Sequence, residues 1–237
     1  MKREVMNLKD LCAYLRLPEK EVMRRIESQG LPGRRVRGEW IFHKVEVDDW
    51  LQRTMPALPP EQLSRLEKGG LRSETPIKED LLVTPLLRKD AIRIGMAART
   101  RASVLRELVE IAEGTGLVYD PERLARSLRE REDLCSTALG GGVAIPHPRT
   151  RQPWMLAEDF LVAGVHPRGI PFGGPDGSLV DLFFMPLCVT DQKHLQVLAR
   201  LARILQDKRF LESLREAGDA EELLDLLRKK EKSLLRS

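Results

Sequence analysis

Apolar residues recur at helical spacing in some segments of this chain and alternate with polar residues in others, and the two periods predict different elements. The first fifty residues predict a helix that Asn7 caps and that ends at 17–18, followed by a second helix over 19–29. Alternating apolar residues then predict a hairpin that turns at Gly38, and a third helix that ends near Trp50. This order is typical of a helix-turn-helix with a small hairpin wing.

The stretch from about 54 to 80 has a different composition. It is rich in Pro, Gly and charged residues, with one short helix predicted over 61–68. No internal repeat crosses it, so we expect a fusion of two unlike modules. The predicted organisation is a first domain over 1–54, a linker over 55–79 and a second domain over 80–232.

The second half of the chain mixes helical and strand-like patterns. An amphipathic helix is predicted over 103–112, and another begins at 120–121. Strand-like runs at 160–165 and 180–189 precede three more helices, over 194–206, 208–215 and 219–229. Strands and helices alternating in this way predict an α/β or α+β domain with a buried sheet.

Length allows either one large domain or a small domain plus a medium one, and does not choose between them. The chain has 237 residues, of which 42% are hydrophobic and 32% charged. No apolar run approaches the ~18 residues that cross a bilayer, and the charged start MKREVMNLKDL is unlike a signal peptide. We therefore expect a cytoplasmic protein with no membrane span. The three cysteines, Cys12, Cys135 and Cys188, are far apart and indicate neither a disulfide framework nor a structural zinc site.

The distribution of charge says more than the net charge of +4. Residues 1–53 hold twelve Lys and Arg against nine Asp and Glu, a difference of +3. Within 20–37 only Glu21 and Glu27 oppose six basic residues, which are Lys20, Arg24, Arg25, Arg34, Arg35 and Arg37. One short segment of the chain is therefore distinctly basic, although the net charge alone does not establish a nucleic-acid partner.

Residues 5–53 resemble the excisionase-type, MerR-like helix-turn-helix module. The resemblance rests on LKDLCAYLRLPEKEVMRRIESQGLPGRRVRGEWIFHKVEVDDWLQR, with its Gly-Leu-Pro after the second helix, the Gly-x-Trp of the wing and the closing Asp-Trp-Leu. It implies that the second helix enters the major groove and that the wing meets phosphates. The implied DNA-binding residues are Lys20, Met23, Arg24 and Glu27 on the helix, and Arg34, Arg35 and Arg37 on the wing. The alternative is a solvated basic face on a domain that binds protein.

A second motif, GGGVAIPHPRT at 140–150, holds one of the chain's four histidines between two prolines. The three glycines permit a tight turn, and 143–145 predicts a short buried strand. Pro146 fixes the chain before His147, and Pro148 biases that histidine toward extended geometry. An imidazole held at a fixed angle suits a nucleophile, and a neutral histidine can accept a phosphoryl group and pass it on.

Residues about 80 to 230 resemble the type-2 enzyme IIA domain, of the fructose, mannitol and nitrogen-regulatory branches, of the phosphoenolpyruvate-dependent phosphotransferase system (PTS). The resemblance implies a sandwich with a central mixed sheet flanked by helices, and it makes His147 the phosphoacceptor. The family signature is met by Glu132, Leu139, Gly140, Val143, Ala144, Ile145, Pro146 and His147. One position departs, because Pro148 stands where the family has Gly, Ala or Cys.

Two further stretches extend this resemblance. REREDLCST resembles the family's stretch upstream of the site, which makes Arg131 the basic residue that steadies phosphate charge. By the same likeness Ser136, Thr137 and Glu132 surround the phosphate. DQKHLQVLARLARILQD resembles the stretch with the family's second active-site histidine, which makes His194 its match.

Other site chemistries fit the sequence poorly. LGGGVAIPH lacks the G-x-G-x-x-G spacing and leads into a strand, so it does not indicate a dinucleotide site. The histidines at 147, 166 and 194 lie outside any HExxH or CxxC pattern, so no metal site is expected. We expect no cofactor. His166 and His43 are interpreted as surface or turn residues.

The two resemblances together imply a cytoplasmic regulator. Its IIA-like domain would accept a phosphoryl group on His147 from an HPr-like phosphocarrier and report the state of the phosphotransferase system to a DNA-binding domain. One alternative is a soluble PTS component that passes phosphate to a IIB protein and uses its N-terminal module for protein docking. Another is that Pro148 marks a domain which has lost phosphorylation and only binds partners. Whether the chain counts as an enzyme or a phosphocarrier, and whether it forms a homodimer, stays open.

Overall fold

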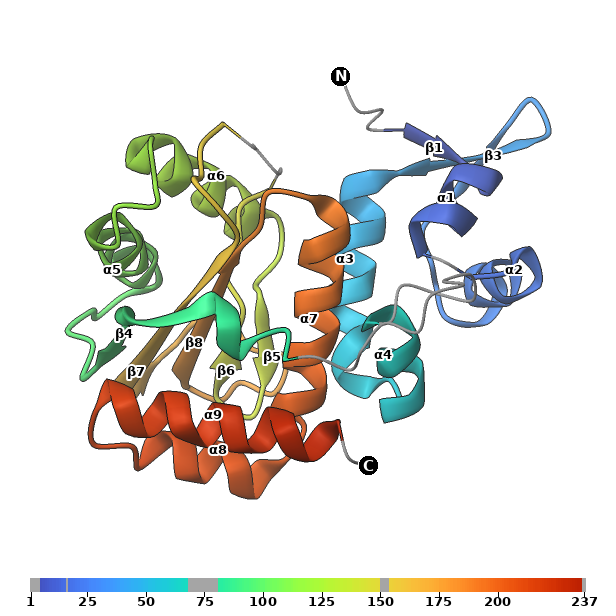
Figure 1. Ribbon diagram of the computed structural model, residues 1–237. Coiled ribbons are helices and arrows are strands. Elements are labelled where there is room, and N and C mark those ends of the chain that lie inside the picture. Colours follow the sequence, from blue (N-terminus) through green and yellow to red (C-terminus); the bar gives the residue numbers. More distant parts are fainter. Residues whose placement is uncertain (1–4, 16, 68–80, 150–153, 236–237) are drawn as a thin grey trace. The chain divides into compact units, whose positions relative to one another are not determined.

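The computed structural model describes residues 5–15, 17–67, 81–149 and 154–235 (Figure 1). The chain divides into two compact units, Met1–Lys78 and Glu79–Ser237. Within the described ranges, no helix combines the length and the apolar composition that crossing a membrane requires.

The first unit is a helix-turn-helix with a three-stranded antiparallel sheet in the order β1-β3-β2. Its elements are β1 Val5–Asn7, α1 Leu8–Leu15, α2 Glu19–Ser28, β2 Arg34–Val36, β3 Glu39–His43 and α3 Lys44–Thr54. Asn7 caps α1 as predicted, because its Oδ1 accepts a hydrogen bond from the backbone N–H of Asp10 at 2.8 Å. The strand β1, which no periodicity indicated, adds a third strand beside the predicted hairpin.

The hairpin wing turns on two residues with positive φ. Arg37 has φ +53° and Gly38 has φ +87°, between the paired residues Val36 and Glu39. A two-residue turn with both central residues in this region is type I′, whose twist matches that of the flanking strands. An arginine therefore lies at the tip of the wing, in a left-handed conformation that is unfavourable for a residue other than glycine.

Two further elements belong to the first unit. A 3₁₀ helix, η1, spans Met55–Ala57, and α4 spans Pro60–Glu67, one residue off the short helix predicted there. The side chain of Arg25 on α2 donates a hydrogen bond to Oε1 of Gln62 at 3.1 Å. A polar contact thus joins the helix-turn-helix to a segment that composition alone assigned to the linker.

The second unit is built on a five-stranded mixed sheet in the order β4-β7-β8-β6-β5. The strands are β4 Leu87–Ile94, β5 Ala138–Gly140, β6 Val143–Ala144, β7 Phe160–Ile170 and β8 Val180–Leu187. The pairs β4·β7 and β6·β8 are parallel, whereas β7·β8 and β5·β6 are antiparallel. The mixed sheet confirms the predicted fold class.

Helices cover both faces of this sheet (Figure 1). They are α5 Arg101–Gly114, α6 Pro121–Leu134, α7 Asp191–Leu205, α8 Lys208–Arg215 and α9 Ala220–Leu234, and the 3₁₀ helix η2 Thr84–Leu86 precedes β4. Alternate residues of the two long central strands, such as Phe160 and Val162 of β7, join a core cluster with α5 and α6. Their neighbours Leu161 and Ala163 are equally buried and point to the opposite face, because side chains alternate along a strand.

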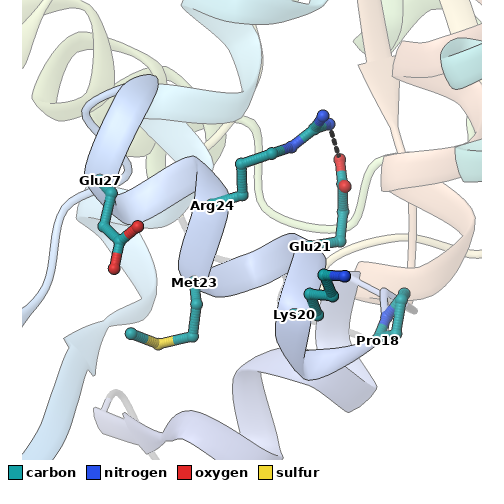
Figure 2. Close-up of a pocket in the computed structure, with 6 residues that line it drawn as sticks. All are labelled: Pro18, Lys20, Glu21, Met23, Arg24 and Glu27. Atoms are coloured by element: carbon teal, nitrogen blue, oxygen red, sulfur yellow. Dashed lines mark hydrogen bonds and ion pairs between the residues drawn. The ribbon is translucent and has the colours of Figure 1, made fainter.

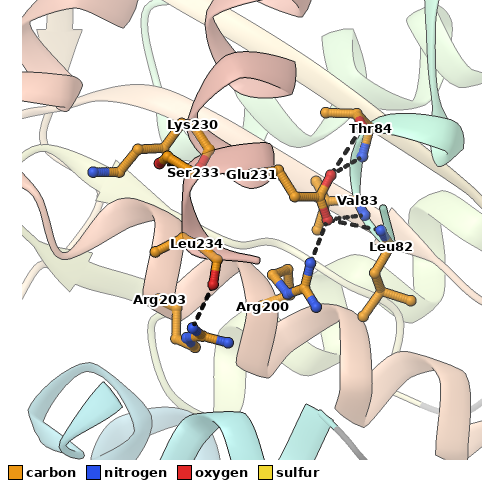
Figure 3. Close-up of polar contacts among 9 residues, drawn as sticks. All are labelled: Leu82, Val83, Thr84, Arg200, Arg203, Lys230, Glu231, Ser233 and Leu234. Atoms are coloured by element: carbon orange, nitrogen blue, oxygen red, sulfur yellow. Dashed lines mark hydrogen bonds and ion pairs between the residues drawn. The ribbon is translucent and has the colours of Figure 1, made fainter. Parts of the chain in front are cut away.

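A buried carboxylate joins the beginning and the end of the second unit (Figure 3). Glu231 of α9 is completely buried, and its two oxygens accept hydrogen bonds from the backbone N–H groups of Leu82, Val83 and Thr84 at 2.7–2.9 Å. The Thr84 hydroxyl donates at 2.8 Å, and Nη1 of Arg200 on α7 donates at 3.0 Å. We call this set the Glu231 clasp. It fixes α7 and α9 against the segment that precedes β4.

Candidate active site

A glycine turn leads the chain into the site. Gly140, Gly141 and Gly142 all have positive φ, between +64° and +94°, in the turn from β5 to β6. Gly142 has φ +81°, a backbone conformation that residues with a Cβ rarely adopt, and a Cβ there would also displace the end of the Arg215 side chain. Asp176 holds the same turn from outside, because its Oδ2 accepts from the Gly141 N–H at 2.8 Å.

Hydrogen bonds to the Asp176 carboxylate make the stability of the fold depend on pH. The Gly141 N–H, then the Ser178 hydroxyl and N–H, lower the pKa of Asp176 to about 2. A carboxylate with a folded-state pKa below its unfolded value of about 3.9 stabilises the fold at higher pH, and that contribution is lost as the pH falls from about 4 to 2. We expect Asp176→Asn to lower the urea midpoint at pH 6 and to match the wild type near pH 2, in unfolding curves collected across this range. A gap that persists at pH 2 would contradict the assignment.

His147 follows β6 and is 2% exposed. Its Nδ1 lies 2.8 Å from the carbonyl oxygen of Ile145. A carbonyl can only accept, so Nδ1 must carry the proton, and Nε2 keeps its lone pair. The protein therefore fixes the tautomer whose free lone pair lies on Nε2.

Arg131 lies beside that nitrogen. It belongs to the last turn of α6, is 4% exposed, and its Nε donates to Nε2 of His147 at 3.2 Å. Its Nη1 also donates to the Cys135 carbonyl at 2.8 Å, which holds the guanidinium in place. The C-terminal end of a helix favours a cation, and a buried guanidinium beside a nucleophile can stabilise a phosphoryl group.

His194 completes a buried group of three. It lies in the first turn of α7, where Thr190 caps the helix by accepting from the Lys193 N–H at 3.2 Å. Its ring centroid is 5.0 Å from that of His147, and the two planes are inclined by 50°. The structure thus brings together His147, His194 and Arg131 from three separate elements.

The other residues expected around the phosphate make contacts within the scaffold. The two oxygens of Glu132 accept from the N–H and the hydroxyl of Thr137, at 3.1 and 2.7 Å. The hydroxyl of Ser136 donates to the Phe172 carbonyl at 2.8 Å. Burial raises the pKa of Glu132, and the hydrogen bonds from Thr137 act in the opposite direction. Since the Thr137 carbonyl accepts from the Ile145 N–H at 3.1 Å, this pair supports the segment that leads from β6 to His147.

Pro148 lies in a segment whose backbone is tied to α6. It is buried, and the next residue, Arg149, donates its backbone N–H to Oγ of Ser127 at 3.1 Å. Ser127 is a buried residue of α6 that the sequence did not single out. The chain beyond His147 is therefore held on the same helix that carries Arg131.

The histidine at 166 differs from the expected surface residue. It is 9% exposed, its Nε2 donates to the Ala98 carbonyl at 2.8 Å, and its Nδ1 accepts from the Arg168 N–H at 3.2 Å. Both ring nitrogens are used within the scaffold. His166 therefore has a structural role within β7.

Five basic residues of the first unit keep the exposure that DNA binding requires. These are Lys20, Arg24, Arg34, Arg35 and Arg37. The Arg35 guanidinium lies over the Trp40 ring, 5.1 Å from its centroid, and Arg34 is ion-paired with Glu46 at 3.4 Å. Arg25, which added to the basic count, is instead 2% exposed and belongs to the interior.

A comparison with known families decides the assignment. Residues 85–230 match the family described as the phosphoenolpyruvate-dependent sugar phosphotransferase system, EIIA 2. The chain belongs to the EIIA type-2 family. Residues 5–55 separately match a helix-turn-helix domain, so an excisionase-like module accompanies the EIIA domain.

Several relatives share the EIIA domain. A nitrogen regulatory protein of Bradyrhizobium diazoefficiens is 34% identical over 148 residues, which cover 61% of this chain and 94% of that protein. The fructose-specific EIIABC component of Bacillus subtilis is 26% identical over 152 residues, which cover 63% of this chain and only 24% of that longer protein. A solved Escherichia coli complex of enzyme IIA(Mtl) with phosphorylated enzyme IIB(Mtl) matches with a TM-score of 0.54 and 25% identity, over 61% of this chain and 99% of that one.

Proposed function

We propose that this chain is a regulator whose EIIA domain accepts a phosphoryl group on His147 from an HPr-like phosphocarrier, and whose helix-turn-helix domain binds DNA with an affinity that depends on this phosphorylation. The observation that carries the first half is the fixed tautomer of His147, with Nε2 facing Arg131 and the His194 ring beside it. The matching nitrogen regulatory protein, which the EIIA domain covers almost completely, supports a regulatory role.

The transfer uses the lone pair of Nε2. This nitrogen attacks the phosphorus of the carrier's phosphohistidine, the carrier's N–P bond breaks, and its electron pair returns to the carrier's ring. The His147 ring gains an Nε2–P bond and keeps its proton on Nδ1, where the Ile145 carbonyl accepts it. Because the Nε2 lone pair is now used in the N–P bond, Arg131 donates to the negatively charged phosphoryl oxygens instead of to Nε2.

Intact-mass analysis tests this step. The full chain is incubated with phosphoenolpyruvate, enzyme I and an HPr-like carrier from the same cell. We expect a gain of about 80 Da, the mass of one phosphoryl group, that is lost in acid. No gain with a carrier that phosphorylates another EIIA protein in parallel would overturn the proposal.

The wing provides a separate test of DNA binding. Arg37→Asn keeps a residue that tolerates positive φ and removes one cation from the wing's tip. We expect unchanged thermal stability, and a plot of log Kd against log salt that is shallower by about 0.9 on a mixed-sequence duplex. Lys229→Gln, which removes an exposed cation from α9, is the matched control and should leave the slope unchanged. Equal slopes for wild type and R37N would exclude a phosphate contact at this position.

The second candidate is a PTS component that passes its phosphoryl group to a IIB protein and uses the first unit for protein docking. It is supported by the solved relative in complex with a phosphorylated IIB enzyme. Transfer of the phosphoryl group from the chain to a IIB protein, together with no affinity for duplex DNA at low salt, would favour this candidate over the regulator.

A further inference from the structure

One exposed arginine on the second helix of the first unit is paired with a carboxylate of the same helix. Figure 2 shows Arg24 and Glu21 of α2 pointing toward each other. Nη2 of Arg24 donates to Oε1 of Glu21 at 2.6 Å, although the Arg24 side chain is 58% exposed. A solvent-exposed arginine ordinarily samples many rotamers, so this ion pair restricts it.

The carboxylate that holds Arg24 is itself anchored to the interior. The same Oε1 of Glu21 accepts from Nε of Arg25 at 3.3 Å. Arg25 is buried, lies 5.9 Å from the centroid of the Trp50 ring, and donates to Gln62 of α4. The buried Arg25 therefore positions the Glu21 carboxylate, and Glu21 in turn positions the Arg24 guanidinium.

The surface around this pair is hollowed. Pro18, Lys20, Glu21, Met23, Arg24 and Glu27 line a pocket of about 470 Å³ (Figure 2). Bidentate contact with O6 and N7 of guanine needs two coplanar N–H donors presented together, which a preset guanidinium provides. The exposed ammonium of Lys20, on the same face, has no such directional geometry.

We infer that Glu21 is a positioning residue which presets Arg24 to recognise guanine in the DNA major groove. This inference rests on the proposed DNA-binding function and names the base that its recognition helix selects. The hydrogen bonds from Arg24 and Arg25 lower the pKa of Glu21 against the opposing effect of burial, so the carboxylate stays charged at neutral pH. A charged acceptor is what a guanidinium needs to stay oriented.

The test begins with selection of duplexes from a random-sequence pool by the full chain, followed by affinities for the selected site and for the same site with one guanine replaced. We expect Glu21→Gln, which keeps the side chain's shape, to reduce guanine discrimination by roughly ten-fold. Affinity for mixed-sequence DNA should hold or rise, because a negative charge is removed from the binding face. Lys20→Gln, the matched control, should weaken binding to all duplexes equally.

A double-mutant cycle separates positioning from a merely structural role. In an Arg24→Ala background, E21Q should have no further effect on discrimination, since the residue it positions is gone. Thermal unfolding of each variant checks that Arg25 stays packed. Guanine discrimination unchanged in E21Q, or an equal loss on all duplexes, would overturn the inference while leaving DNA binding in place. A wild-type chain that enriches no duplex would instead overturn the DNA-binding function itself.

Discussion

His147→Ala is expected to abolish acid-labile phosphorylation of the chain, a loss of at least roughly a thousand-fold in transfer rate. The reason is that the nucleophilic lone pair belongs to Nε2 of this ring, which the Ile145 carbonyl and Arg131 hold in one tautomer and one orientation. The measurement is incorporation of radiolabelled phosphate from phosphoenolpyruvate through the carrier, with intact mass as the second readout.

Two variants complete that experiment. His43→Ala removes an exposed histidine of the first unit and should be labelled as fast as the wild type. His147→Gln, which fills more of the buried site, guards against a loss caused by misfolding and should also stay unlabelled. Label that persists in folded H147A protein would show that another residue is the acceptor.

The second large effect is on stability. Glu231→Ala is expected to lower the free energy of unfolding of the second unit by about 3–5 kcal/mol, the range measured when one partner of a buried ion pair is removed. The alanine leaves the Arg200 cation, three backbone N–H groups and the Thr84 hydroxyl without their carboxylate acceptor. Because domains are stable by only about 5–15 kcal/mol, this is a large share of the total.

Hydrogen exchange in increasing urea, followed on peptides from β7 and β8, measures this loss within the second unit. Glu221→Ala is the matched control on the same helix, because its side chain is exposed in an ion pair with Lys89. We expect the control to change stability by no more than about 0.5 kcal/mol. Equal effects of E231A and E221A would mean that the clasp adds nothing beyond a surface ion pair.

Much of the architecture could be predicted from local signals. Helical spacing and caps located α1, α2, α5, α6 and α7 to within a few residues, because these signals lie within one or two turns of the helix. The glycine turn and the two prolines marked His147, and the resemblance to the family added Arg131 and His194. That these three meet in one buried group depends on the sheet order, which spacing along the chain does not reveal.

Other features escaped the sequence for physical reasons. The edge strand β4 was missed because Arg88, Lys89 and Asp90 interrupt its apolar alternation. Arg25 was counted as a surface cation, although Trp50 and Gln62, far along the chain, bury it. The Glu231 clasp joins Glu231 to backbone groups that lie about 150 positions earlier in the sequence. No local pattern in the sequence indicates such a contact.

We expect phosphorylation of His147 to change the affinity with which the helix-turn-helix domain binds DNA. The most direct measurement is the affinity of the full chain for its selected duplex, before and after stoichiometric phosphorylation, at one salt concentration. We expect this affinity to change by at least about five-fold, within the usual range of coupling between two sites, and to stay the same when H147A is treated identically. Equal affinities of the phosphorylated and unphosphorylated wild type would contradict it.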